Sequence, residues 1–535
     1  MRTHQEETLA PLPVGAPAPD FALPGAPRST VMLHGFDGRA VVLAFYPMDW
    51  EPVSREQLTL YQAYADAFGR LEASLLGISV DHVHSHEAFA RDAGLRFPLL
   101  ADFQPRGRVA RRYGVFRAAQ GVSARALFVL DARRVIRFSK AYTDPLNPGV
   151  DVPEEALADL RRRVEATIWP EKETVADASQ GVQLATMRAL ARYWATEYDW
   201  RACEARLQAL PQFVTEIDGL DIHFLHVRSK HADALPLLVT HGWPGSVVEL
   251  LEVVGPLTDP TAHGGAPEDA FHLVLPSLPG YGFSAEPAEV GWDPGRTARA
   301  WVELMRRLGY TRYVAQGGDQ GAGVTDLLAR LAPEGLLGVH FNFLDAAPRE
   351  LLMAAVGLRL AFSEEERAEF GRFAGIFKRG YIAEMGEHPQ TIGYSLLDSP
   401  VGLAAWMLDH DADSYAKISR AFLEGTPAGG LTRDRILDNL TLYWVTGSGA
   451  SSARLYWEFA QGVPAAIKQP PPHVTLPVAF TVFPGEIFRA PRHWEEKAYH
   501  NLIYFHEAER GGHFAAWEEP ELFCEEVRAA FKSLR

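Results

Sequence analysis

Residues 313–321 read Tyr313-Val314-Ala315-Gln316-Gly317-Gly318-Asp319-Gln320-Gly321. The apolar start is typical of a buried strand, and after Gly321 the apolar residues recur at helical spacing until Pro333. We therefore expect a strand, a tight turn and a helix, with Asp319 at the apex of the turn. Gly317 and Gly321 lie on either side of it and permit the strained backbone that holds a nucleophile above the edge of a sheet.

The residue at the apex indicates the reaction type. A carboxylate is already ionised at neutral pH, so Asp319 needs no base before it attacks, and it forms an ester to carbon. This predicts displacement at a saturated carbon atom. Because an aspartate in a glycine-rich turn is usually only a turn former, the prediction depends on the other features of the chain.

Composition restricts the class of protein. At 535 residues the chain is longer than one hydrophobic core normally supports, so at least two domains are expected. Its 52 basic and 68 acidic residues give a net charge of −16, which repels nucleic acid and anionic membranes. The first residues lack the apolar run of a signal peptide, and no later run is long enough for a membrane helix. We expect no nucleic-acid or membrane partner and a cytoplasmic location.

Cysteine content argues against a disulfide framework or a cysteine zinc site. Only Cys203 and Cys524 are present, far apart in the sequence, and both are expected to be small buried hydrophobic residues. No cluster of metal-ligating residues has suitable spacing, and a permanently charged nucleophile needs no activation. We therefore expect neither a metal nor an organic cofactor.

Residues 1–165 alternate strand-like and helix-like patterns, which predicts a small α/β domain. The expected elements are strands over 40–45, 75–80 and 126–130, with helices near Arg55 and over 86–93. The domain resembles the peroxiredoxin branch of the thioredoxin fold, in the runs Phe45-Tyr46-Pro47-Met48-Asp49-Trp50-Glu51-Pro52-Val53-Ser54, Gly77-Ile78-Ser79-Val80-Asp81, Phe97-Pro98-Leu99-Leu100-Ala101-Asp102 and Arg125-Ala126-Leu127-Phe128.

The residues at the positions that match the family's active site imply that this domain is redox-inactive. Ser54 stands where the family has its peroxide-attacking cysteine, and Glu51 stands where it has a Thr or Ser that helps to bind peroxide. A serine hydroxyl stays protonated at neutral pH and cannot cycle through sulfenic acid. Arg125 matches the arginine that stabilises the family's thiolate and is expected to persist as a structural charge. Two roles stay open: a folding or dimerisation module, or a sensor or docking surface.

Apolar periodicity lapses over residues 166–183, which we interpret as a linker. The region 184–535 begins with a segment, 184–230, whose second half alternates like a hairpin around Asp218-Gly219. Buried-strand patterns follow at 235–240, 271–276, 313–316, 336–343, 478–483 and 502–505. They predict a mostly parallel sheet built from residues 231–345 and 470–535. Residues 346–469 are mostly helical in pattern and too long for a connection, so we expect an inserted helical cap.

Backbone donors are expected beside Asp319. The run Thr240-His241-Gly242-Trp243-Pro244-Gly245-Ser246 comes directly after the first buried strand. Its loop can therefore face the top of the Asp319 turn. The N–H groups of Trp243 and of Gln320, at the helix start, are the predicted oxyanion hole.

A base and its acid partner are expected at the far end of the chain. His513 lies in Gly511-Gly512-His513-Phe514 after the last strand, third in the order nucleophile, acid, histidine. Glu486 ends the preceding strand, where its carboxylate could hold the second ring nitrogen of His513. Asp345, after the strand over 336–343, is the alternative acid.

With these pieces together, residues 184–535 resemble the epoxide hydrolases of the α/β-hydrolase superfamily, especially the microsomal-type branch. The motifs are Tyr198-Asp199-Trp200-Arg201, Pro211-Gln212-Phe213, His241-Gly242-Trp243-Pro244-Gly245-Ser246, Gly280-Tyr281-Gly282-Phe283-Ser284, Gly317-Gly318-Asp319, Asp398-Ser399-Pro400-Val401-Gly402-Leu403-Ala404, Phe483-Pro484-Gly485-Glu486 and Arg510-Gly511-Gly512-His513-Phe514-Ala515-Ala516. The resemblance implies an α/β-hydrolase fold with a helical cap.

The resemblance also implies two cap tyrosines that hydrogen-bond the epoxide oxygen. The matching positions are Tyr381 and Tyr456, with Tyr394 as a nearby alternative to Tyr381. A phenol can supply a proton to the alkoxide that ring opening leaves. Family members often carry an aromatic residue after the nucleophile, whereas this chain has Gln320, which makes one wall of the pocket polar.

The expected function is hydrolysis of an epoxide to a vicinal diol through a covalent ester on Asp319, which water activated by His513 and Glu486 then hydrolyses. The alternatives are a haloalkane dehalogenase with the same nucleophile, against which Gln320 and the paired tyrosines argue, and a non-catalytic scaffold or redox sensor. The expected partners are a small epoxide and water. The identity and stereochemistry of the epoxide and the oligomeric state, with a homodimer as one option, stay open.

Overall fold

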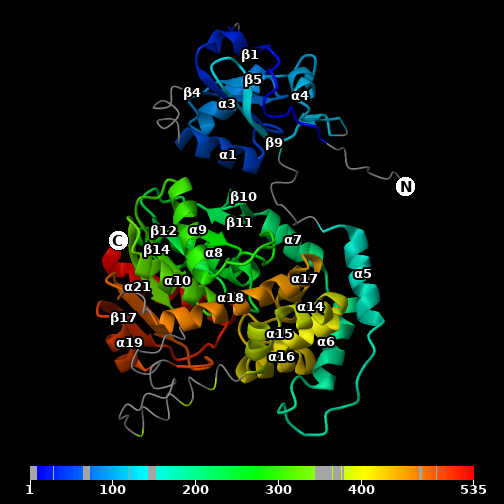
Figure 1. Ribbon diagram of the computed structural model, residues 1–535, viewed down its shortest axis with the longest axis vertical. Coiled ribbons are helices and arrows are strands. Elements are labelled where there is room, and N and C mark those ends of the chain that lie inside the picture. The colour runs from blue at the N-terminus through cyan, green and yellow to red at the C-terminus, as the bar shows by residue number, and fades with distance from the viewer. Residues whose placement is uncertain are drawn as a thin grey trace. The chain divides into compact units, whose positions relative to one another are not determined.

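The computed structural model describes residues 9–27, 29–63, 73–118, 120–141, 152–343, 379–468, 473–489 and 491–535, together with residues 364, 371 and 375 (Figure 1). The chain divides into two compact units, Met1–Pro148 and Gly149–Arg535. This boundary lies earlier than the predicted linker over 166–183. The reason is α5 (Glu154–Glu165), whose Leu157, Leu160 and Val164 are buried in the same hydrophobic cluster as α6 (Leu184–Thr196).

The first unit has the thioredoxin-like sheet that the sequence predicts, in the order β5-β4-β3-β8-β9. The pairs β3/β4 and β4/β5 are parallel, and β3/β8 and β8/β9 are antiparallel. Its elements are β1 (Ala22–Ala26), β2 (Ser29–Met32), β3 (Ala40–Phe45), α1 (Pro52–Ala63), β4 (Ala73–Ser79), α3 (Val83–Asp92), β5 (Leu99–Ala101), α4 (Arg108–Arg112), β6 (Phe116–Arg117), β7 (Val122–Ser123), β8 (Ala126–Leu130) and β9 (Ile136–Ala141).

The second unit is built on an eight-stranded sheet in the order β10-β11-β13-β12-β14-β15-β16-β17. All pairs from β13 to β17 are parallel, while β10 and β11 form the predicted hairpin, with Asp218 and Gly219 both at positive φ. The strands are β10 (Gln212–Ile217), β11 (Leu220–Val227), β12 (Leu235–Thr240), β13 (Phe271–Pro276), β14 (Tyr313–Gly317), β15 (Leu336–Phe341), β16 (Val478–Val482) and β17 (Leu502–Glu507).

Helices cover both faces of this sheet. Successive strand residues point to opposite faces, and here both sets are apolar and buried. Leu238 of β12 joins the cluster formed with α9 (Pro294–Arg307) and α10 (Gln320–Leu331), whereas its neighbours Leu237 and Val239 join the cluster formed with α8 (Leu251–Thr258) and α21 (Pro520–Phe531). The remaining helices outside the cap are α7 (Trp200–Gln208), α19 (Arg492–Ala498) and α20 (Ala515–Glu518).

The predicted helical cap is present between β15 and β16 (Figure 1). Its described helices are α13 (Gly380–Glu387), α14 (Pro389–Asp398), α15 (Pro400–Leu408), α16 (Ala412–Glu424), α17 (Arg433–Val445) and α18 (Ser448–Lys468). In Figure 1, α14 to α17 gather on one side of the unit and α18 lies between them and the core. The alternative acid Asp345 lies outside the described residues. Among the helices that the structure describes, none is long and apolar enough to cross a membrane.

Candidate active site

Asp319 occupies a strained turn between β14 and α10. Its backbone has φ 52° and ψ −130°, a conformation that costs energy for a residue with a side chain. The flanking glycines are required by close approach: a Cβ at Gly317 would lie 2.3 Å from the Gly321 carbonyl oxygen, and a Cβ at Gly321 would lie 2.0 Å from the Thr240 carbonyl oxygen. The turn therefore has the geometry of a nucleophile elbow, as predicted.

Parallel strands place the predicted loops at one edge of the sheet, because β12, β14, β16 and β17 all end there. The Trp243 N–H donates to Asp319 Oδ1 at 2.8 Å. Gly242 is needed for this approach, since a Cβ there would lie 2.5 Å from Asp319 Oδ1. The cap holds the loop in place, because Tyr443 of α17 donates its hydroxyl to the Gly245 carbonyl at 2.7 Å.

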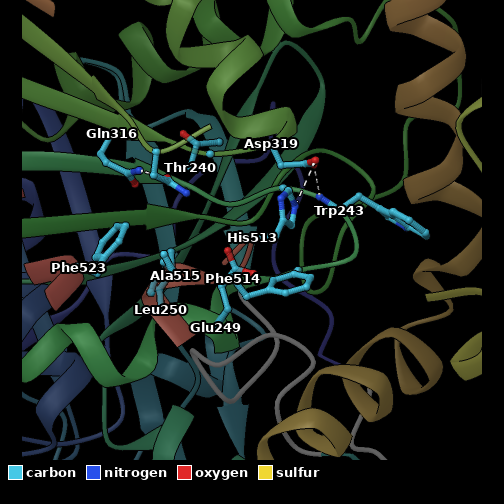
Figure 2. Close-up of a pocket in the computed structure, with 15 residues that line it drawn as sticks. Thr240, Trp243, Glu249, Leu250, Gln316, Asp319, His513, Phe514, Ala515 and Phe523 are labelled. Carbon is cyan, nitrogen blue, oxygen red and sulfur yellow. Dashed lines mark hydrogen bonds and ion pairs between the residues drawn. The ribbon is translucent and has the colours of Figure 1, made fainter. Parts of the chain in front are cut away.

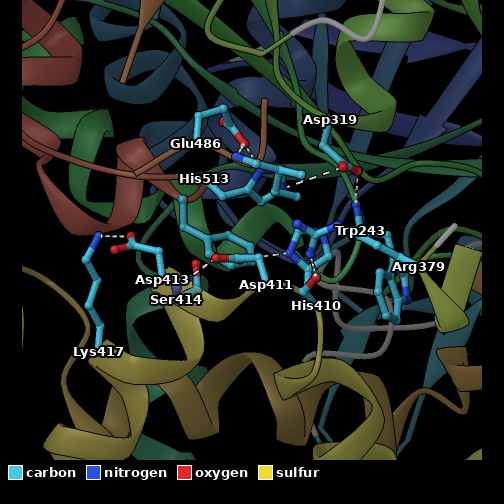
Figure 3. Close-up of polar contacts among 12 residues, drawn as sticks. Trp243, Asp319, Arg379, His410, Asp411, Asp413, Ser414, Lys417, Glu486 and His513 are labelled. Carbon is cyan, nitrogen blue, oxygen red and sulfur yellow. Dashed lines mark hydrogen bonds and ion pairs between the residues drawn. The ribbon is translucent and has the colours of Figure 1, made fainter. Parts of the chain in front are cut away.

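His513 joins Asp319 to Glu486 (Figure 3). Its Nε2 lies 3.5 Å from Asp319 Oδ2, and its Nδ1 lies 2.6 Å from Glu486 Oε1. Backbone pairing aligns the two loops, since the Gly485 N–H donates to the Gly511 carbonyl at 3.0 Å. The side chains of His513 and Glu486 are buried, and that of Asp319 is 14% exposed.

Asp319 and His513 each stabilise the charged form of the other. Burial alone would raise the pKa of Asp319, but the hydrogen bond and charge of His513, followed by His410 and the Gln320 backbone N–H, lower it. Burial alone would lower the pKa of His513, but Glu486 and Asp319 raise it well above its usual value. Before substrate binds, the site therefore contains an ionised Asp319 beside a protonated imidazole.

Tyr381 and Tyr456 reach this site from cap helices α13 and α18. The Tyr381 ring stacks on Trp243 with centroids 5.0 Å apart, and the Tyr456 ring meets the same indole edge-on at 5.8 Å. Burial, and then the charge of Asp319, raise the pKa of both phenols well above 10, so both carry their protons at neutral pH. The alternative Tyr394 is 70% exposed and does not join the group.

A small cavity lies beside the nucleophile and is lined by Asp319, His513 and Glu249 (Figure 2). Burial raises the pKa of Glu249 to about 8, so this carboxyl is mostly uncharged at neutral pH. Gln316 and Asn342 line the same cavity and are joined by a 2.7 Å hydrogen bond. Neither Glu249, which lies in the 3-10 helix Val247–Leu250, nor this amide pair was predicted, because only the folded chain brings them beside Asp319.

His410 is a further unpredicted residue of the site. It lies in the turn between α15 and α16, and its ring is 4.4 Å from that of His513, centroid to centroid. Asp319, His410 and His513 each offer a ligand atom within 4.8 Å of the others, which is close enough to hold a metal ion. Asp319 and His513 also contact each other directly, at 3.5 Å, so an ion there would compete with that contact.

Comparison with known proteins identifies the family. The model described as Epoxide hydrolase N terminus matches residues 147–250. A protein of Stigmatella aurantiaca (strain DW4/3-1) that bears an epoxide hydrolase name is 52% identical over 388 residues, covering 72% of this chain and 84% of that protein. The chain belongs to the epoxide hydrolase family. Epoxide hydrolase 1 of Oryctolagus cuniculus is 35% identical over 399 residues, covering 71% of this chain and 86% of that protein.

Solved structures agree with this family. The juvenile hormone epoxide hydrolase from the silkworm Bombyx mori is 29% identical with a TM-score of 0.62, covering 72% of this chain and 93% of that one. The Aspergillus niger epoxide hydrolase is 31% identical with a TM-score of 0.60, covering 72% and 95%. The second unit is thus an epoxide hydrolase with an α/β-hydrolase fold, an enzyme that acts on a small epoxide and water. This favours the epoxide prediction over the haloalkane alternative.

The first unit is similar to another family, since the AhpC/TSA family model matches residues 14–139. Here Arg125 donates to Ser54 Oγ at 3.0 Å and to Glu51 Oε2 at 2.6 Å, and the Ser54 hydroxyl donates to the same carboxylate oxygen at 2.7 Å. Burial would raise the pKa of Glu51, but Arg125 lowers it. Glu51 therefore places a negative charge beside Ser54.

Proposed function

We propose that this epoxide hydrolase works through a covalent ester on Asp319. The observation that carries the proposal is the placement of the Asp319 carboxylate, which has the Trp243 N–H on one oxygen and His513 near the other. The oxygen not held by Trp243 attacks an epoxide carbon, the carbon–oxygen bond of the ring breaks, and Tyr381 or Tyr456 gives a proton to the alkoxide.

Ester formation prepares His513 to act as a base. The negative charge of Asp319 is lost in the ester, so one of the two charges that raise the pKa of His513 disappears. His513 gives its proton to the tyrosine that was deprotonated in ring opening, and the neutral imidazole, held by Glu486, then takes a proton from water. The resulting hydroxide adds to the ester carbon, while the N–H groups of Trp243 and Gln320 hold the oxyanion. The departing diol oxygen takes the water's other proton, and His513 keeps the proton it took, which restores the protonated imidazole beside an ionised Asp319.

The test is capture of the ester during the first turnover. Acid quenching within that turnover should yield a peptide containing Asp319 whose mass has increased by the mass of the epoxide. Diol formation at the normal rate with no modified peptide at any quench time would reject the covalent route.

Removing the phenol groups should slow ring opening. Tyr381→Phe and Tyr456→Phe should each lower the rate of ester formation by about 100-fold, because each removes one donor to the developing alkoxide. The double variant should be slower than either single variant. Tyr394→Phe is the matched control, since that side chain is exposed on α14, and it should retain the wild-type rate. An equal loss in the control would show that the effect is not specific to the site.

For the first unit we propose a redox-inactive role that depends on Glu51 as much as on Ser54. Ser54→Cys alone should give a thiol whose pKa is not below the usual value of about 8.5, because Glu51 already neutralises Arg125 and repels a thiolate. Combining it with Glu51→Thr should lower that pKa by a unit or more, to about 7.5. The rate of alkylation by iodoacetamide against pH measures both. A low pKa in the single variant would contradict this account.

A further inference from the structure

His410 is held rigidly beside the nucleophile by cap residues (Figure 3). Arg379 donates to its backbone carbonyl at 2.7 Å, and its Nδ1 lies 3.0 Å from Asp411 Oδ2. Asp411 is itself fixed, because it caps α16 by accepting the Ser414 N–H at 2.8 Å. The ring packs between His513, at 4.4 Å, and Tyr381, at 5.2 Å. A buried histidine fixed at three points presents its remaining ring nitrogen in one direction.

That remaining nitrogen has no protein partner. Nε2 of His410 is buried and makes no hydrogen bond to any residue that the structure describes. Burial and the charge of His513 lower the pKa of His410, so the ring is neutral, and its Nδ1–H is used on Asp411. Nε2 is then a lone-pair acceptor. A buried acceptor without a partner is costly, and the usual solution is a bound water.

The surrounding atoms are placed to share such a water. One ring nitrogen each of His410 and His513 and one oxygen of Asp319 lie within 4.8 Å of one another, a spacing at which a single water can hydrogen-bond to all three. We propose that His410, oriented by Asp411, holds the hydrolytic water together with His513. The proposal rests on the covalent mechanism proposed above and assigns a catalytic residue to its second step.

The proton count of the water supports this pairing. A water molecule has two hydrogens, and in the ester both His513 Nε2 and His410 Nε2 are acceptors, since each Nδ1–H is used on a carboxylate. One hydrogen goes to each ring, so a lone pair is left to face the ester carbon of Asp319. As the new carbon–oxygen bond forms, the proton facing His513 moves to that nitrogen. The other stays on the oxygen, held by His410, and later leaves on the diol.

The test separates the two chemical steps. Rapid acid quenching under single-turnover conditions gives the rates of ester formation and ester breakdown for His410→Phe, which keeps the ring shape without nitrogens. Ester formation should change by less than about twofold, whereas breakdown should slow by about 10- to 100-fold, so that ester accumulates. His410→Gln, which returns a polar atom near the Nε2 position, should recover part of the breakdown rate. Asp411→Asn should slow breakdown by a smaller factor than His410→Phe.

His340→Phe is the matched control. His340 is also a buried histidine with one unpartnered ring nitrogen, but it lies in β15 and its other nitrogen pairs with Thr481 at 3.0 Å. This variant should change the melting temperature without changing either chemical rate. A structural defect in His410→Phe would lower both rates together, whereas a lost water site lowers only the second.

Two results would overturn the assignment: an unchanged breakdown rate in His410→Phe, or equal losses in ester formation and breakdown in all three site variants. Failure of the covalent mechanism would look different. In that case the wild-type enzyme itself would form no ester, whatever residue stands at position 410.

Discussion

Replacing Asp319 by alanine is expected to lower kcat/KM for epoxide hydrolysis by at least about 10⁴-fold, because the variant has no atom that can form the covalent bond. Diol formation measured against the uncatalysed background tests this. The fold should persist, since alanine removes a buried charge at a strained position that does not support the core, and the melting temperature should be equal or higher.

Measuring product affinity in Asp319→Ala separates a loss of chemistry from a loss of binding. The oxyanion-hole donors and both tyrosines remain, so the variant should still bind the diol product with an affinity close to that of the wild-type enzyme. Retention of more than about a tenth of the wild-type kcat/KM would exclude Asp319 as the nucleophile.

Replacing His513 by glutamine is expected to block the second step rather than the first. Asp319 stays ionised and the tyrosines stay in place, so ester should still form, but its breakdown should slow by about 10²- to 10⁴-fold for loss of the general base. The variant should therefore accumulate one equivalent of covalently modified enzyme, which intact-protein mass spectrometry measures. His500→Gln, at an exposed histidine in the same unit, is the control and should show no accumulation. A His513→Gln variant that turns over without accumulated ester would contradict the assigned base.

The same protonation states predict that kcat and kcat/KM respond differently to pH. The pKa of Asp319 is lowered, so the nucleophile stays ionised as the medium becomes acidic and ester formation continues. His513 must be neutral in the ester. Glu486 keeps the pKa of His513 raised, so ester breakdown is lost as the pH falls through the pKa of His513. With breakdown limiting, kcat should therefore fall on acidification before kcat/KM does. A profile in which kcat/KM falls first would contradict this order.

Sequence order was sufficient to place Asp319, Glu486 and His513 because each of these three follows a strand, and parallel strands end at one edge of a sheet. Asp319, Glu486 and His513 were predictable for this reason, and the structure brings them together. Tyr381 and Tyr394 could not be separated by pattern, since helix packing decides which tyrosine is buried and which is exposed. Tyr381 is 5% exposed and Tyr394 is 70% exposed, which separates them.

Other features lacked a sequence signal. The predicted boundary between the two units lies too far along the sequence. The reason is that α5 has a charged outer face, and its three buried residues interrupt the charged pattern only at helical spacing. His410 is one of 19 histidines and follows no strand. Its place beside His513 results from the packing of the cap on the core, which no local pattern reports. Glu249 likewise joins the cavity only through the loop that Tyr443 holds.

The central claim, that the diol receives its new oxygen from Asp319, is tested most directly by one turnover in ¹⁸O-labelled water with enzyme in excess over epoxide. The account predicts that the diol from this first turnover carries no label, while one ¹⁸O atom enters the Asp319 carboxylate and reaches the diol only in later turnovers. Full labelling of the diol in the first turnover would contradict it, because the oxygen would then have come directly from water.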